Sequence, residues 1–474
     1  MLRRPCGHRS ASAAESPGEL ISLPEHHHIG RTDGKRERQY AKLPGRDPQG
    51  AGLSSLEAPT GTRLSRVYAL LFLASVLMNS ASLALCSFLT DRAQVPLIAT
   101  INILIVVLVR NELFLNGLYP AAVKIARGPR VPIWIKNSVT FGLLYIGGIH
   151  AGCGVASVMW LTVALADLEA RIPDHEHWTV LALAGALLVQ IVSICVLAIP
   201  TIRRKRHDLF EYSHRFVGWS ALLTLWAFVL VTINSPGEPL SLDSALRSPE
   251  FWLAMLITGL IFSPWLTVRK VQVQSRALSS AVVEITFAGG SRPGSFGRIS
   301  RHLLTDWHSF ALVSTGRMAT SHSMIISGVG DFTNELARTP PSVLYVRKVS
   351  YPGLPYCLSM YRRSIIIASG AGMAPYVSAL SDQPYERFRL IWIGRSFREC
   401  FGDELCDTIF RWQNLLLVDT ANGRRPDLVS LAIDNYRSFE ADAIFVGSNP
   451  QGTSQILSGC RALNIPAFGP SWDS

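Results

Sequence analysis

Two glycines close behind a buried apolar run suggest a phosphate site. Residues 365–368 (Ile-Ile-Ile-Ala) have the pattern of a parallel strand covered on both faces, and a Gly-x-Gly-x-x-Pro turn follows. Backbone N–H groups at such a turn can approach an anion closely, and the N-terminus of a following helix adds partial positive charge. The turn lacks the third glycine of the usual dinucleotide fingerprint, so an ordinary strand-to-helix turn is the alternative. The candidate contacts are Gly370, Gly372, Met373, Ala374 and Pro375.

The segment after the next apolar run would meet the ribose of a dinucleotide. Residues 390–394 (Leu-Ile-Trp-Ile-Gly) form that run, and Arg395, Ser396 and Arg398 follow it. At this position a carboxylate accepts the ribose hydroxyls of NAD, whereas arginines suit a 2′-phosphate. Arg395 and Arg398 therefore favour NADPH. Glu399 leaves NADH open, and solvated loop arginines are the alternative interpretation.

Apolar blocks between Leu64 and Val268 are long enough to cross a bilayer. Crossing takes about 20 residues at about 1.5 Å rise each. The blocks predict an integral membrane protein whose first partner is the lipid bilayer. They are Leu64–Leu89, Val95–Leu118, Asn137–Leu165, Trp178–Ile202, Phe216–Ile233 and Phe251–Val268, the second of them interrupted by Arg110 and Glu112.

Flanking charges predict the orientation of these blocks. Cations gather before Leu64, after the second block and at Arg203–Arg206, whereas the loop after the third block is acidic. Positive segments stay on the cytoplasmic side, so both termini are expected in the cytosol. The same loops account for the net charge of +11, and no basic patch with interleaved aromatics predicts nucleic-acid binding. The 8 cysteines lack metal or disulfide spacing.

Changes in periodicity divide the chain into four regions. Residues 1–63 are polar and predict a disordered cytosolic tail, and residues 64–268 carry the six blocks. Residues 269–362 contain short strand-like runs with Gly and Pro turns, the pattern of a small antiparallel β-barrel. Residues 363–474 alternate strands with helices, which predicts a doubly wound α/β domain.

This order of parts resembles the ferric reductase and NADPH oxidase superfamily. Trp307-His308-Ser309-Phe310 resembles its His-Pro-Phe-Thr flavin motif, and Gly330-Asp331-Phe332-Thr333 resembles its glycine–threonine turn at the flavin pyrophosphate. Longer segments beginning at Phe210, Pro293 and Asn422 resemble the fungal TmpA group of membrane flavoproteins. The resemblance covers most of residues 60–474. It implies a membrane six-helix bundle with a cytosolic ferredoxin-reductase-like module.

The resemblance also implies FAD on the barrel and a nicotinamide cofactor on the α/β domain. It places His308, Ser309, Phe310, Gly330 and Thr333 against FAD, and the Gly370–Pro375 turn and Gly447 against the nicotinamide cofactor. Two positions depart from the pattern. Ala311 replaces a Ser or Thr that could bond the flavin N5 edge, and Val446 stands where relatives carry a cysteine facing the nicotinamide.

Haem is not expected, because its usual ligands are incomplete. Haem-bearing relatives carry two histidines thirteen or fourteen residues apart on each of two helices, whereas His150 and His214 have no partners at that spacing. By the block boundaries above, the two histidines differ in depth by about 12 Å, so they are not expected to share one iron. His150, set among glycines, is interpreted as a helix-packing residue.

The sequence therefore predicts a membrane-anchored FAD-dependent oxidoreductase that takes a hydride from NADPH on the cytosolic side. The electron acceptor is unidentified, and no catalytic side chain is assigned. Two alternatives stay open. One is a non-catalytic membrane regulator of fungal development with a relic flavin site, which Ala311 and the missing cysteine favour. The other is a haem-containing transmembrane ferric reductase.

Overall fold

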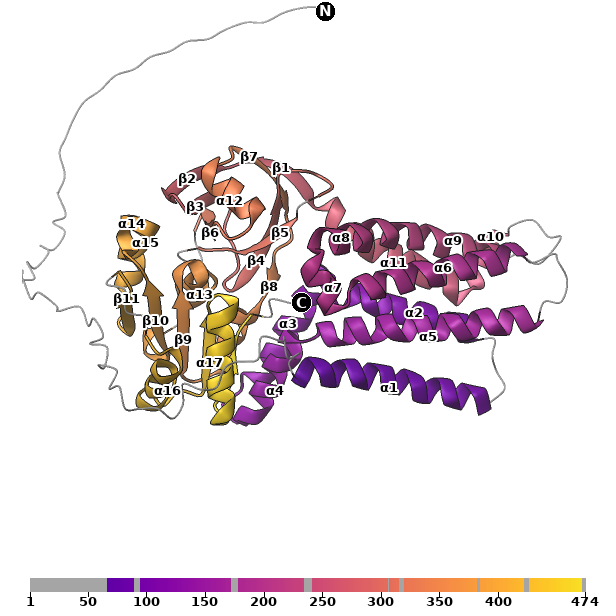
Figure 1. The fold of residues 1–474 in the computed structure, drawn as a ribbon, viewed down its shortest axis with the longest axis horizontal. Helices are drawn as coiled ribbons and strands as arrows, with labels where there is room; N and C mark the ends of the chain where they lie inside the picture. Colours follow the sequence, from indigo (N-terminus) through magenta and orange to yellow (C-terminus); the bar gives the residue numbers. More distant parts are fainter. Residues whose placement is uncertain are drawn as a thin grey trace, which may run out of the picture. The chain divides into compact units, whose positions relative to one another are not determined.

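The computed structural model describes residues 66–88, 94–171, 178–233, 241–305, 307–314, 319–381, 384–421 and 426–470. The expected tail over residues 1–63 lies outside these ranges, as do residues 422–425 of the third TmpA-like segment. The described residues form a bundle of apolar helices, two antiparallel sheets and one parallel sheet (Figure 1).

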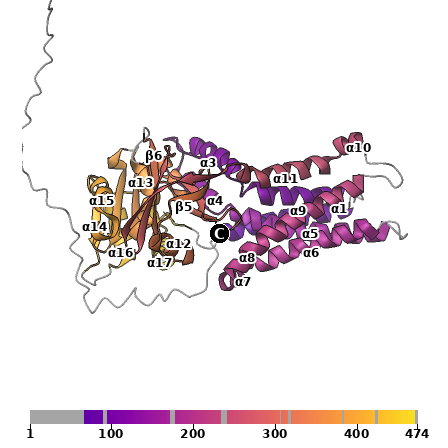
Figure 2. The ribbon, with the colours of Figure 1, turned by 90° about the horizontal axis from the view of Figure 1, so that it is seen from above.

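The helix bundle packs around a core that includes Trp160, Leu187, Leu225 and Ile257. Its main helices are α1 (Arg66–Phe88), α2 (Val95–Leu108), α5 (Gly147–Arg171), α6 (Trp178–Leu197), α9 (Gly218–Ile233) and α11 (Pro249–Leu266). Figure 2 shows α6 and α9 side by side. Along the chain, α6 is connected to α9 by α7 (Pro200–Lys205), α8 (His207–Tyr212) and the π-helix η3 (Ser213–Val217). The short helix α10 (Leu242–Arg247) directly precedes α11.

Five stretches among the described residues are long and apolar enough to cross a membrane. They are Arg66–Cys86, Gly147–Ala170, Trp178–Leu197, His207–Ile233 and Pro249–Leu266, and a sixth is added only if the bent pair α2 and α3 (Glu112–Ala126) counts as one span. These helices are compatible with the predicted membrane protein. The six-span bundle and its orientation stay predictions.

The predicted block Val95–Leu118 is not one straight helix, because the chain turns at Asn111. The helices α2 and α3 meet at an angle of 76°. Asn111 has extended backbone angles, and its side chain accepts bonds from Leu113 N and Phe114 N at 2.9 and 3.4 Å, which starts a new helix. The same side chain donates to Leu260 O of α11 at 2.8 Å, so the turn is tied to the bundle.

The third predicted block, Asn137–Leu165, is also divided. The helix α4 (Ile133–Leu144) ends before Tyr145, and α5 begins at Gly147. Gly148 and Gly152 explain why α5 packs closely on α1, since an added Cβ would lie 2.5 Å from Tyr68 O and 2.7 Å from Phe72 O. The bundle helix therefore starts ten residues later than the sequence predicted, with His150 in its first turn.

The α3–α4 hairpin packs on the parallel sheet. Tyr119, Val123 and Leu143 share one buried cluster with Ile366 and Phe445 of that sheet. Polar contacts fix the same interface. Lys136 Nζ donates to Met360 O at 2.8 Å, and the hydroxyl groups of Thr140 and Tyr361 lie 2.8 Å apart.

Two antiparallel sheets around one apolar core confirm the antiparallel pairing expected after Val268. One sheet has the order β1 (Val268–Gln272), β7 (Val343–Arg347), β4 (Ser295–Ser300), β5 (His308–Ala311), with β8 (Tyr351–Pro352) on β4. The other has the order β2 (Gln274–Ser279), β3 (Val282–Ala288), β6 (Ser321–Ser327). Ile285, Ile299, Ile326 and Leu344 fill the space between them, and α12 (Asp331–Arg338) contributes Leu336. The predicted domain boundaries themselves stay predictions.

A parallel sheet confirms the predicted α/β alternation. Its order is β11 (Leu415–Asp419), β10 (Phe388–Gly394), β9 (Ser364–Ser369), β12 (Ala443–Gly447), β13 (Ala467–Phe468), and every pairing is parallel. Its longer helices are α13 (Ala374–Ser381), α15 (Asp403–Phe410), α16 (Leu428–Ser438) and α17 (Pro450–Ala462), and its short ones are η4 (Leu354–Met360), η5 (Gly370–Met373), η6 (Tyr385–Arg387) and α14 (Phe397–Phe401).

Candidate functional site

The strand order of the parallel sheet locates a binding edge. The chain passes from β9 to β10 and β11 on one side and then returns to β12 and β13 on the other side of β9. In open parallel sheets, ligands bind beyond the carboxyl ends of the strands at the point where the order reverses. Here that point lies between β9 and β12, where Gly370 and Gly447 are found. The sequence-predicted glycine turn is therefore at the sheet's switch point.

The two loops at this point touch through their backbones. A Cβ added to Gly372 would lie 2.0 Å from Gly447 O, and one added to Gly447 would lie 2.1 Å from Gly372 O. No side chain fits at either position. Trp392 Nε1 donates to Gly370 O at 3.0 Å, and the Tyr376 hydroxyl donates to Val446 O at 3.0 Å. Burial raises the pKa of Tyr376, which keeps this hydroxyl a donor.

Gly370 is the position where this edge is open. Its φ of +54° is a left-handed conformation that glycine adopts without strain, and an added Cβ would meet no described heavy atom within 4 Å. Met373, Ala374 and Pro375 follow it into the first turn of α13. All five predicted turn residues thus lie together at one helix N-terminus, with space for an anion beside Gly370.

Sequence reasoning missed a hydroxyl pair at the same edge. Ser369 Oγ and Ser448 Oγ lie 2.8 Å apart at the ends of β9 and β12. Asn449 caps α17 by accepting from Gly452 N at 2.8 Å, and Pro450 opens the helix. The sequence Ser-Asn-Pro carried this information, because Asn before Pro marks a helix start. Two helix N-termini therefore meet at the switch point.

The two predicted arginines are not equivalent. Arg398 is bound by Asp403 Oδ1 at 2.5 Å and Asp407 Oδ1 at 2.6 Å, and these carboxylates raise its pKa. Arg395 is exposed at the end of β10 and forms no ion pair with any residue the structure describes. Its neighbour Ser396 has a φ of 44° and donates its N–H to Asp419 Oδ1 at 3.3 Å. Of these two arginines, only Arg395 has no carboxylate partner among the described residues.

The predicted flavin motif is divided between the two faces of β5. His308 lies against Phe332 with ring centroids 4.0 Å apart, and Phe310 lies 6.4 Å from the same ring. Ser309 points the other way and bonds the Tyr351 hydroxyl. Alternation along a strand explains the division. His308 and Phe310 therefore share one face of β5, and Ser309 lies on the other face; its predicted contact with FAD stays a prediction.

The glycine–threonine turn forms the N-terminus of α12. Thr333 Oγ1 accepts from Val329 N and Gly330 N at 2.9 and 3.0 Å, so its hydroxyl closes the turn. An added Cβ on Gly330 would meet no described heavy atom within 4 Å. The helix end thus borders open space beside His308 and its partner Phe332, which fits a pyrophosphate, although the carboxylate of Asp331 adds negative charge there.

The strand β6 of the second antiparallel sheet contacts the glycine loop. Met373 of the loop shares a buried cluster with Val313 and with Ile325 of β6. The glycine loop is therefore packed against the antiparallel sheet on the face that carries Val313 and Ile325.

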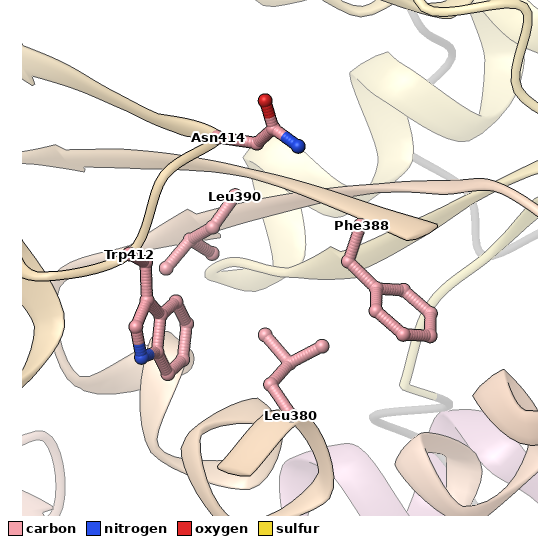
Figure 3. Close-up of a pocket in the computed structure, with 5 residues that line it drawn as sticks. All are labelled: Leu380, Phe388, Leu390, Trp412 and Asn414. Carbon is pink, nitrogen blue, oxygen red and sulfur yellow. The ribbon is translucent and has the colours of Figure 1, made fainter. Parts of the chain in front are cut away.

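The small pocket in Figure 3 is not part of this site. Leu380, Phe388, Leu390, Trp412 and Asn414 line it. Phe388 begins β10 and Asn414 directly precedes β11, so the pocket lies at the amino ends of the strands. The switch point is at the opposite edge.

In the bundle, the prediction that His150 and His214 differ in depth is wrong. Their ring centroids lie 6.0 Å apart. The predicted boundaries put His150 in the middle of a block, whereas α5 begins only at Gly147, and the helix carrying His214 begins at His207. Both histidines are therefore near the same end of their helices.

Both histidines of this pair are half-buried. His150 Nδ1 bonds Val106 O at 2.9 Å, and since a carbonyl only accepts, Nδ1 carries the proton and Nε2 has its lone pair. His214 Nδ1 is buried with no hydrogen-bond partner among the described residues. This donor arrangement, with one ring nitrogen fixed by a carbonyl, is typical of metal-binding histidines.

A buried acid connects the bundle to the first antiparallel sheet. Glu112, at the start of α3, pairs with Arg347 at 3.1 Å and Arg298 at 3.3 Å. The guanidinium of Arg347 also lies over the rings of Trp265 and Trp307 at 5.7 and 5.0 Å. Burial lowers the pKa of Arg347. This cluster fixes the strand β7 against the ends of α2 and α11.

Known proteins resemble this chain in part. Residues 354–474 match the family described as adenylate-forming reductase 03009, C-terminal domain. Over 385 residues the chain is 34% identical to adenylate-forming reductase 06235 of Coprinopsis cinerea. The aligned region covers 80% of this chain and 37% of that protein. Over 272 residues it is 24% identical to ferric reduction oxidase 4 of Arabidopsis thaliana, covering 54% of this chain and 36% of that one. The solved flavohemoglobin of Malassezia yamatoensis aligns with a TM-score of 0.38 and 14% identity, over 80% of this chain and 96% of that one.

The chain spans little more than a third of the length of these curated relatives. The specific resemblance to the TmpA group stays a prediction. The matched relatives are named as an adenylate-forming reductase and a ferric reduction oxidase.

Proposed function

We propose that the protein is a membrane-anchored oxidoreductase that passes a hydride from NADPH to FAD on the cytosolic side. The observation that carries the proposal is the switch point between β9 and β12, where Gly372 and Gly447 meet backbone to backbone beside the open position at Gly370. The reductase relatives and the Arabidopsis ferric reduction oxidase support the same class. The electron acceptor would be a cytosolic or membrane-dissolved molecule.

The residues of the chain bind and orient. The backbone of Gly370 and the N-terminus of α13 would hold the pyrophosphate of NADPH, and Arg395 would hold its 2′-phosphate. The N-terminus of α12 and the face of β5 with His308 would hold FAD. NADPH supplies the hydride and FAD accepts it when both are bound. Trp392 and Tyr376 keep the two glycine loops in contact.

The test is the visible spectrum of the purified full chain before and after NADPH is added without oxygen. Oxidised-flavin bands that bleach support the proposal. Flavin bands that persist would instead support a membrane regulator with a relic flavin site, and a protein without flavin would refute the proposal.

The distance between His150 and His214 favours a second candidate, a haem-containing reductase. The two rings are close enough that one metal ion could be held between their nitrogens. The observed 6.0 Å and the proton on His150 Nδ1 fit this arrangement. A haem held by these residues would carry single electrons from the flavin into the bundle.

A Soret band in the same spectrum decides between the two candidates. If it is present and is lost in both His150→Ala and His214→Ala, one haem is bound by the pair. If it is absent after expression with added haem precursor, the histidines have a packing role.

A further inference from the structure

The α3–α4 hairpin carries exposed apolar side chains on the side away from the parallel sheet. On α3, Leu113, Gly117, Ala121 and Ile125 recur every four residues and are exposed, with Leu113 at 52% and Ile125 at 78%. Residues at this spacing lie on one face of a helix. At the start of α4, Trp134 is 66% exposed. We refer to these five residues together with Ile133 as the hairpin face.

The opposite side of the hairpin packs against the parallel sheet. Tyr119, Val123 and Ala126 of α3 and Leu143 of α4 are buried against the parallel-sheet core. Asn116 also donates to Ser350 O at 2.7 Å. The hairpin is therefore held in place, and the hairpin face cannot be buried by rotation of the two helices.

Three cations accompany the hairpin face. Lys124, Arg127 and Arg130 are exposed in the last turn of α3 and the connection to α4. Within the described ranges, none of the three pairs with an acid. Exposed Trp and aliphatic side chains beside Lys and Arg are typical of segments that lie in a bilayer interface.

The turn at Asn111 orients the hairpin so that it can lie along a bilayer surface. The helix α2 belongs to the bundle core through Val95 and Ala99, and α3 leaves it at 76°. If α2 crosses the bilayer, α3 runs close to the plane of the bilayer, at the level where α2 ends. A helix in this position presents one long face to the lipid headgroups.

We propose that the hairpin face rests on the bilayer surface and binds anionic phospholipid. Trp134 and Ile125 enter the boundary between headgroups and acyl chains, and Lys124, Arg127 and Arg130 contact anionic headgroups. The uncompensated positive charge selects lipid over a second copy of this chain, because two such faces would repel each other. The proposal rests on the membrane anchoring in the proposed function and is independent of its redox chemistry.

The experiment is photo-crosslinking of the full chain in nanodiscs of mixed phosphatidylcholine and phosphatidylserine. The variant Trp134→p-benzoylphenylalanine should form lipid adducts that are detected by mass. The control is the same replacement at Leu463, which is 49% exposed at the end of α17 and should form none. Equal lipid yields at the two positions, or adducts between two copies of the chain, would overturn the proposal.

Neutralising the cations tests lipid selectivity. Phosphatidylserine should be enriched in the Trp134 adducts at least fivefold over its share of the bilayer, since each basic residue near an anionic surface contributes about a fivefold preference. The added changes Lys124→Gln, Arg127→Gln and Arg130→Gln should remove this enrichment while adducts persist, and unchanged enrichment would contradict the role of the cations. Flavin bleaching by NADPH, measured in the same discs, separates the two proposals. Bleaching without lipid adducts would refute only this inference, and adducts without bleaching would refute only the redox function.

Discussion

The contact between Gly372 and Gly447 supplies the sharpest test of the nucleotide site. In Gly372→Ala the new Cβ would lie 2.0 Å from Gly447 O. Carbon–oxygen contacts are normally about 3.3 Å or longer, so the two loops must separate by about 1 Å. Overpacking of this kind costs about 1–3 kcal/mol of stability, and a misplacement of about 1 Å can cost about 100-fold in rate. We expect flavin bleaching by saturating NADPH to slow by about that factor, measured by anaerobic stopped-flow absorbance.

A matched control separates loop displacement from backbone strain. Gly370→Ala places a methyl group at φ +54° but in open space. It should cost about 1–2 kcal/mol of stability through strain alone, without opening the contact between the loops. Thermal unfolding of both variants tests whether the protein stays folded. If Gly372→Ala bleaches flavin at the wild-type rate, the two loops do not need to touch, and the argument from the switch point fails.

Further predictions concern charges and thiols. Arg395→Leu should raise the ratio of KM for NADPH to KM for NADH about tenfold, since a hydrogen bond to a charged group contributes about 1.5 kcal/mol or more. Arg398→Leu should leave this ratio unchanged, because two carboxylates already bind Arg398. Initial rates with both nucleotides measure the ratio, and a larger change in Arg398→Leu than in Arg395→Leu would contradict the assignment. Glu112→Gln should lower the free energy of unfolding by about 3–5 kcal/mol, because it leaves two arginines without their carboxylate. Denaturant titration measures this change, and an unchanged midpoint would show that the ion pairs do not stabilise the fold. Burial raises the pKa of Cys406 to about 11, so the native state loses stability as pH rises from the unfolded thiol pKa, about 8.5, through that value. Iodoacetamide at pH 8 should therefore alkylate the half-buried Cys400 before Cys406, and equal labelling by peptide mass would contradict the burial.

The parallel sheet was the most predictable part of the fold. A run such as Ile365–Ala368 is apolar on both faces, and the glycine turn behind it is a local signal, so neither depends on distant contacts. The strand order that brings Gly447 to Gly370 does depend on them. Only a resemblance to known proteins could suggest that pairing, and Ser448 was missed because its role arises from the strand it follows.

The helix boundaries were harder to predict, because they depend on what each apolar helix packs against. Hydropathy does not distinguish an apolar helix in lipid from one that packs on a sheet, so Leu118 and Asn137 were both assigned to spans. Asn111 before Glu112 is a helix-start signal that could have located the turn. The error in depth for His150 followed directly from the missed break before Gly147.

The α3–α4 hairpin also has a consequence for how the chain is made. Thr140 of the hairpin contacts Tyr361, which follows it in the sequence by 221 residues. At synthesis rates of about 5–20 residues per second, the hairpin emerges roughly 10 to 45 s before the segment that covers it. Val123 and Leu143 are without their native cover during that interval, which is long compared with the formation of a helix. The nascent hairpin therefore needs a temporary binding surface, which the adjacent lipid or a chaperone can supply. A fragment beginning at Val268 would emerge without the hairpin and expose Ile366 and Phe445 instead.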